Sequence, residues 1–328
     1  MDTKQVSNVN TGNLRGVFRV IERTLYNGVK IPAIGLGPGG MGYKPNVRPV
    51  RAPARWNIPL RAWNKIKRPV MKRLERMEYV SAVANGIRAG FRLIDYSTAY
   101  GNGGLIADAI DKSGVSRNDI FLTGRISNSA QFKGAQAVED QIKRHLEEYR
   151  TDHVDVLMFH WPVTGCYEQT WRVVCNAYEK GLTKSVGVAN CHRRHIETLM
   201  KCGLKPMINQ FEVHPLFTQK DLIKFNQDLG IQVESYTPIA RFDDRLMRLP
   251  KLKKIAGAHG KTSVQTILRW HIQQGLVPII RSLNAERQQE NYGVFDFELS
   301  SDEMAVIDSF NIDARIRYDP DNCDFTIL

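Results

Sequence analysis

Short apolar runs alternate with amphipathic stretches along most of this chain. The runs have the length of buried strands, and the stretches between them repeat apolar residues at helical spacing. Strands are predicted near Ala33 and Leu93 and over residues 120–122, 154–159, 185–188, 207–208, 232–235 and 277–280. Helices are predicted over residues 105–112, 136–149, 167–180, 194–201, 219–229 and 263–274. The pattern therefore indicates about eight strand–helix units.

Regular alternation of this kind implies parallel strands joined by helical crossovers, and eight units fit a closed (β/α)8 barrel, the TIM barrel fold. A doubly wound α/β sheet is the alternative. It is disfavoured because no GxGxxG turn follows the first strand. The Asn27-Gly28 pair, between apolar residues, predicts a β-hairpin that caps the barrel at its N-terminal end.

One strongly basic segment interrupts the alternation. Residues 43–78 contain eleven lysines and arginines but only two glutamates. Prolines break its first part, and from about Val70 the pattern is that of a helix, which Gly90 closes. We expect a polar arm over residues 1–16 and a single barrel domain over 17–328. The basic insertion, at about 43–78, then serves as a lid or a binding surface.

Composition narrows the class of protein. The net charge of +12 in 328 residues is concentrated in the insertion, which suits an acidic substrate, a nucleic acid, an anionic surface or solubility alone. No apolar run is long enough to span a membrane, the first residues show no secretory signal, and the five cysteines form no CxxC pair. We expect a cytoplasmic monomer or weak dimer without a membrane or nucleic-acid partner.

The candidate chemistry lies where predicted strands end. FRLIDYSTAYGN, residues 91–102, passes from a buried strand to a loop that carries Asp95 and Tyr100. Taken alone, this stretch fits two interpretations equally well: Asp95 and Tyr100 are site residues, or they are only a helix-capping acid and a half-buried tyrosine. Polar or aromatic residues also end the later strands: Arg125, His160, Trp161, Asn190, Gln210, Tyr236, Arg281 and Ser282.

Seven of these segments together resemble the aldo-keto reductases. In order they read IDYSTAYGN, IFLTGRI, VDVLMFHWP, VGVANCH, INQFEVHP, VESYTPIA and IIRSLNAERQQEN. The likeness runs from about Thr24 to the C-terminus and is interrupted only by the basic insertion. The resemblance implies a (β/α)8 barrel in which NADPH delivers a hydride to an aldehyde or ketone.

The resemblance also assigns catalytic positions. Asp95, Tyr100 and His160 match three of the family's four. Hydride arriving at a carbonyl carbon places negative charge on the oxygen, so the site needs a proton donor, here Tyr100, and a group that orients the carbonyl, here His160. A phenol donates poorly at neutral pH unless a cation lowers its pKa, and Asp95 holds that cation. Trp161 is expected to line the substrate pocket.

The fourth catalytic position departs from the family, which has lysine where this chain has Arg125. A guanidinium keeps the charge and can pair with Asp95, but it is larger, planar and never deprotonated. Three outcomes stay open: a slower reductase, a reductase adapted to an acidic substrate that Arg125 binds, and a cofactor-binding protein with little turnover.

The cofactor positions are closer to the family pattern. Asn190 and Gln210 resemble the pair that holds the carboxamide, and Tyr236 resembles the ring stacked on the nicotinamide. The remaining positions resemble the grip on the 2'-phosphate and the residues near the adenine: Arg281, Ser282, Arg287, Glu290 and Asn291. Basic groups around a phosphate ester favour NADP(H) over NAD.

The sequence thus predicts an NADP(H)-dependent oxidoreductase that reduces an aldehyde or ketone, or runs the reverse reaction. The alternative is an NADPH-binding barrel with weak or no turnover that acts as a sensor or scaffold through its basic insertion. We expect no metal, because His153, His192, His195 and His214 share no metal-ligand spacing.

Overall fold

The computed structural model describes residues 20–39, 58–97, 101 and 103–327, and in residues 58–71 it describes the helix but not the side chains. Eight parallel strands close into a barrel in the order β10-β3-β4-β5-β6-β7-β8-β9. Their bounds are β3 (Gly35–Leu36), β4 (Leu93–Ile94), β5 (Phe121–Ile126), β6 (Val156–Phe159), β7 (Val186–Ala189), β8 (Ile208–Glu212), β9 (Gln232–Tyr236) and β10 (Val277–Ile280). The predicted (β/α)8 barrel is confirmed.

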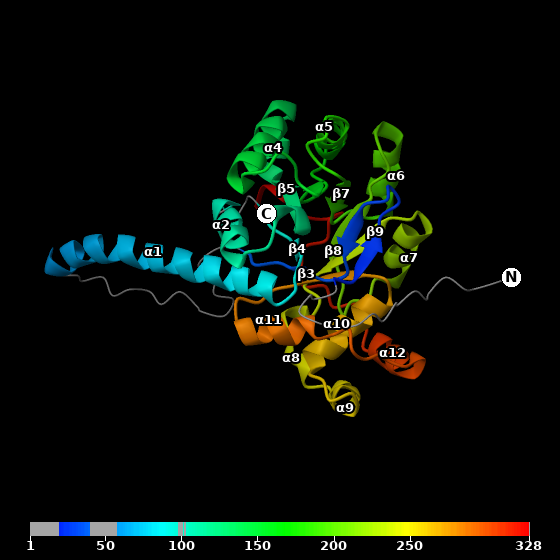
Figure 1. The fold of residues 1–328 in the computed structure, drawn as a ribbon. Coiled ribbons are helices and arrows are strands. Elements are labelled where there is room, and N and C mark those ends of the chain that lie inside the picture. Colours follow the sequence, from blue (N-terminus) through cyan, green and yellow to red (C-terminus); the bar gives the residue numbers. More distant parts are fainter. Residues whose placement is uncertain (1–19, 40–57, 98–100, 102, 328) are drawn as a thin grey trace.

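Helices surround the barrel on its outer side (Figure 1). They are α1 (Ile58–Arg88), α2 (Gly103–Ser113), α3 (Asn128–Lys133), α4 (Ala135–Tyr149), α5 (Tyr167–Glu179), α6 (Arg193–Cys202), α7 (Lys220–Asp228), α8 (Asp244–Met247), α9 (Pro250–Ala258), α10 (Ser263–Gln273), α11 (Ala285–Tyr292) and α12 (Ser301–Asp308). Their apolar faces and the strands form one continuous core. Trp270 belongs to this core, as expected from its place in a helical pattern.

The predicted N-terminal hairpin is also confirmed. β1 (Glu22–Thr24) pairs antiparallel with β2 (Lys30–Pro32), with Thr24 opposite Lys30. Gly28 in the turn has a φ of 86°, a conformation that glycine adopts without steric cost.

The prediction for the basic insertion was wrong in one respect. Helix α1 begins at Ile58, twelve residues before the expected start near Val70, so Pro59 and Pro69 lie inside it. Pro59 falls in the first turn, where a backbone N–H has no intrahelical acceptor, and at Pro69 the helix continues with one hydrogen bond fewer. The first part of α1 projects away from the barrel beyond α2 (Figure 1). Residues 43–57 of the insertion and the arm 1–16 lie outside the described residues.

Four strands differ in length from the prediction. β9 gains only Tyr236 at its end, and the two longer extensions, in β5 and β8, change the placement of site residues. β5 extends to Ile126 and β8 to Glu212, so Arg125 and Gln210 lie within strands and not beyond their ends. At the start of β6, Val154 forms only an isolated bridge to Thr183. The polar side chains of β5 and β8 interrupt the apolar runs, which is why the pattern predicted strands that end too early.

Candidate functional site

A buried ion pair lies at the centre of the barrel mouth. The Arg125 guanidinium on β5 contacts the carboxylate of Asp95, which follows β4 directly. The side chains are 7% and 12% exposed, respectively. A charge buried this far requires a partner, and the pair provides one for each residue. The predicted pairing of Asp95 with Arg125 is thus present.

Gln210 holds the same guanidinium from the other side. Its Oε1 accepts a hydrogen bond of 2.8 Å from Arg125, and its Nε2 donates one of 2.7 Å to Glu234 on β9. Because β5 and β8 are not neighbouring strands, Arg125 and Gln210 meet across the barrel interior. The amide expected to face a nicotinamide is therefore also part of the Arg125 environment.

His160 follows β6 at the same rim. Burial lowers its pKa to about 3, and the cations Arg125 and Arg317 act in the same direction. The imidazole is therefore neutral near pH 7 and offers one N–H donor, as a group that orients a carbonyl oxygen requires. Arg317 comes from the C-terminal segment, whose position the strand pattern did not predict.

Tyr236 and Asn190 form a second pair at the rim. The Tyr236 hydroxyl donates to Asn190 Oδ1 at 2.6 Å, and Asn190 Nδ2 donates to the backbone oxygen of His160 at 2.9 Å. Asn190 has a φ of 60°, a left-handed conformation that asparagine tolerates better than most residues. The hydrogen bonds and the backbone together fix the carboxamide of Asn190 between β6 and β9.

The proposed phosphate grip lies at the start of α11. Ser282 is buried, and Asn284 caps the helix by accepting from the Arg287 N–H at 2.8 Å. The Arg281 guanidinium lies so close to Gly39 that a Cβ added there would come within 2.9 Å of it. Glu290 accepts from Thr262 at 2.8 Å, and Asn291 is buried. A helix N-terminus flanked by two arginines is well suited to a phosphate.

Two expected roles are not tested by the structure. Tyr100 lies outside the described residues, so its role as proton donor stays a prediction. Trp161 is 1% exposed and packs against Val163 and Phe325, with its backbone oxygen accepting from Gln131 at 3.0 Å. The contact with Phe325 ties the C-terminal segment to the residue next to His160, and lining of a substrate pocket by Trp161 stays a prediction.

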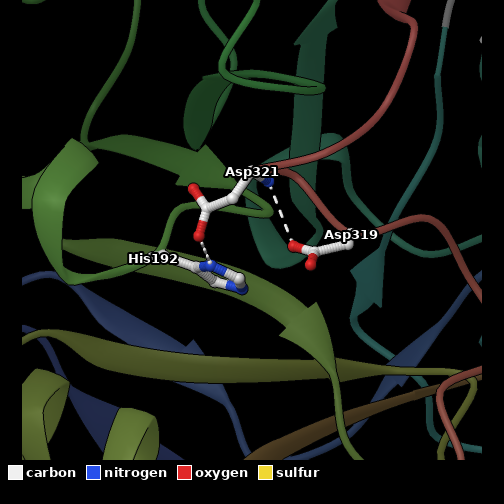
Figure 2. A group of neighbouring side chains, drawn as sticks. All are labelled: His192, Asp319 and Asp321. Atoms are coloured by element: carbon white, nitrogen blue, oxygen red, sulfur yellow. Dashed lines mark hydrogen bonds and ion pairs between the residues drawn. The ribbon is translucent and has the colours of Figure 1, made fainter.

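The structure brings together one group that sequence spacing did not reveal. The side chains of His192, Asp319 and Asp321 lie together (Figure 2), and the atoms with which they could hold a metal ion are within 4.8 Å of one another. Asp321 already accepts from His192 at 2.6 Å and from Arg194 Nε at 2.6 Å. These bonds fasten the C-terminal segment to the start of α6, and the Arg194 cation disfavours a metal there.

Sequence reasoning missed Glu234 and Glu212. Glu234 lies two residues before Tyr236 on β9, and Glu212 lies two residues after Gln210 on β8, so each shares a face of its strand with an expected site residue. Glu212 accepts from the backbone N–H groups of Ile316 and Arg317 at 2.7 and 2.8 Å, which anchors the C-terminal segment. The period-two rule was the signal that could have identified both acids.

The ion pair, the neutral histidine and the start of α11 lie at the carboxyl ends of the strands of a (β/α)8 barrel, where enzymes with this fold have their active sites. Residues 65–312 match the aldo/keto reductase family, and the chain belongs to that family. It is 36% identical to the Bacillus subtilis oxidoreductase YtbE over 307 residues, which are 92% of this chain and 97% of that protein.

Two further relatives are informative. The glyoxal reductase of Bacillus subtilis is 36% identical over 245 residues, which are 74% of this chain and 87% of that protein. A Bombyx mori aldo-keto reductase solved in complex with NADP is 27% identical, with a TM-score of 0.77 over 93% of this chain and 97% of that one.

In the described part of the chain, no helix is long and apolar enough to cross a membrane.

Proposed function

We propose that this protein reduces a small aldehyde or ketone to an alcohol, or catalyses the reverse oxidation, with NADP(H) as the cofactor. The Asp95–Arg125 pair beside a neutral His160 is the observation that carries the proposal. It supplies a fixed cation and an N–H donor where negative charge develops on a carbonyl oxygen.

The residues present fit NADP(H). Arg281 over the Gly39 backbone, Ser282 and the start of α11 next to Arg287 suit the 2'-phosphate, and Asn190 and Gln210 are proposed to hold the carboxamide. The bound dinucleotide supplies the hydride. This chain's residues do the rest: His160 orients the substrate oxygen, and Tyr100 is proposed to give it a proton.

Arg125 influences that proton transfer through charge. A guanidinium held by Asp95 and Gln210 stays positive throughout, so it favours the ionised form of a nearby phenol without itself taking up or releasing a proton. Proton donation by Tyr100 to the substrate oxygen then leaves a tyrosinate whose charge Arg125 stabilises. Because one relative is a glyoxal reductase, small dicarbonyl compounds are the first substrates to test.

An assay of NADPH oxidation by the purified protein, with glyoxal and a panel of other carbonyls, decides between the reductase and the NADPH-binding sensor or scaffold. Turnover that requires a carbonyl supports the reductase. NADPH binding, seen as a shift of its fluorescence, without oxidation by any carbonyl would refute the reductase and favour the sensor or scaffold. In Arg125→Lys, a large gain in rate means that the native site is attenuated, whereas a loss means that arginine suits its own substrate.

A further inference from the structure

Glu234 is a carboxyl group in the interior of the barrel that the reaction described above does not use. Its residue is 0% exposed. Oε2 accepts from Gln210 Nε2 at 2.7 Å, whereas Oε1 has no hydrogen-bond partner among the described residues. Branched apolar side chains usually fill this interior, and burying a carboxyl there is costly. A role in packing alone does not account for the choice of glutamate.

The hydrogen-bond chain that starts at Glu234 leads to the catalytic pair. An amide has one end that accepts and one that donates, and a guanidinium only donates, so Gln210 turns its Oε1 toward Arg125 and Glu234 Oε2 accepts from the remaining Nε2. If the amide were turned over, its NH2 group would face the guanidinium, and two donors would oppose each other. Glu234 therefore holds the end of the amide that Arg125 cannot use, and Arg125 keeps an acceptor on each side, Gln210 and Asp95.

The charge of Glu234 is set by the same group of residues. Asp95 and Arg125 are the charged groups that face it among the described residues, and the neighbouring strand β10 presents only apolar side chains and a proline. Burial, and then the Asp95 carboxylate, raise the pKa of Glu234 to about 8, although Gln210 and Arg125 oppose the shift. The carboxyl is thus protonated near neutral pH, and the charges of Asp95 and Arg125 balance.

We propose that Glu234 is a positioning residue of the reductase site, which orients Gln210 and through it the Arg125 guanidinium. The proposal rests on the proposed function, because its consequence is a guanidinium placed for proton transfer. It also explains how an arginine is accommodated where the family has lysine: the larger group gains a second fixed acceptor in Gln210.

Two substitutions separate orientation from charge. Glu234→Gln reproduces the shape and hydrogen bonding of the protonated carboxyl but cannot ionise, so its single-turnover rate of NADPH oxidation at pH 6 should equal that of the wild type. Above pH 8 the wild-type rate should show a step that Glu234→Gln lacks. Glu234→Leu removes the acceptor, and its rate should fall about tenfold at every pH with little change in the KM for the carbonyl.

A double-mutant cycle tests the route through Arg125. In an Arg125→Lys background, Glu234→Leu should change ln(rate) by less than half as much as it does in the wild type, because the shorter lysine side chain does not depend on the hydrogen bond to Gln210 for its position. Asp155→Asn is the matched control. It also removes a buried carboxylate, but one that accepts from the Leu122 N–H and pairs with Arg117 and Lys184, away from the ion pair.

Two readouts do not depend on turnover. The infrared carbonyl band of a protonated carboxylic acid should be present at pH 6, disappear as the pH rises through about 8, and be absent in Glu234→Gln. Glu234→Leu should also bind NADPH several-fold more weakly, because Gln210 loses its orientation. The proposal is overturned if Glu234→Leu leaves the rate and the NADPH affinity unchanged and the double-mutant cycle is purely additive. If the wild type shows no turnover but the infrared band and the loss of NADPH binding are found, only the proposed function is refuted.

Discussion

Replacement of Glu234 by glutamine should stabilise the protein, and the gain should grow with pH. The pKa of this carboxyl is about 8 in the folded state against 4.5 for the exposed group. The folded state therefore binds more protons between these values, and the free energy of unfolding falls as the pH rises through the window. The stability that the protonated Glu234 contributes is fully present below pH 4.5 and is completely lost above about pH 8.

The size of the effect follows from the shift. One pKa unit corresponds to about 1.4 kcal/mol, so the wild type loses about 3 kcal/mol at pH 7 and about 5 kcal/mol above pH 8. Glu234→Gln keeps the hydrogen bond with Gln210 and has no group to ionise, so it avoids the loss. For a domain of this size, that is a rise in Tm of several degrees at pH 8 and almost none at pH 4.5.

Equilibrium urea unfolding of wild type and Glu234→Gln at several pH values between 4.5 and 8.5 measures the difference directly. Asp155→Asn serves as the control and should destabilise the protein, because it breaks ion pairs with Arg117 and Lys184. A Glu234→Gln variant that is no more stable than the wild type at pH 8, or whose gain is the same at every pH, would refute this account of Glu234.

Three further predictions concern other parts of the site and the core. Asp95→Asn leaves Arg125 buried without its counter-charge, so unfolding should become easier by about 3 kcal/mol and turnover should drop; equal urea midpoints would contradict the ion pair. Burial lowers the pKa values of His145 and His271 to about 4 and about 3, so in Glu234→Gln, where the opposing effect of Glu234 is absent, stability present above pH 6.5 should be lost as the pH falls toward 4. A flat urea midpoint of that variant over this range would argue against neutral burial of the two histidines. Arg287→Ala should weaken NADPH binding about tenfold but leave NADH binding unchanged, and an equal loss for both would exclude a 2'-phosphate contact.

The local pattern of the sequence was sufficient to predict the barrel fold. Alternating apolar runs and helical stretches imply parallel strands and crossovers, and Asn27-Gly28 specifies the hairpin turn, because these depend on periodicity and turn chemistry within a few residues. The start of α1 was missed because a local rule failed there. Prolines usually break a helix, and neither Pro59 nor Pro69 does so here.

The residue types of the site were also evident from the chain, since polar residues interrupt apolar runs at Arg125 and Gln210. The hydrogen bond that connects these two residues was not evident. Arg125 and Gln210 are 85 positions apart on strands that are not neighbours, and only closure of the barrel brings them within 2.8 Å. The charge of Glu234 depends on that closure as well, because burial and the nearby Asp95 set its pKa. Sequence alone thus determined which groups this protein carries, and the tertiary structure decided which of them share a buried hydrogen-bond network and which hold a proton.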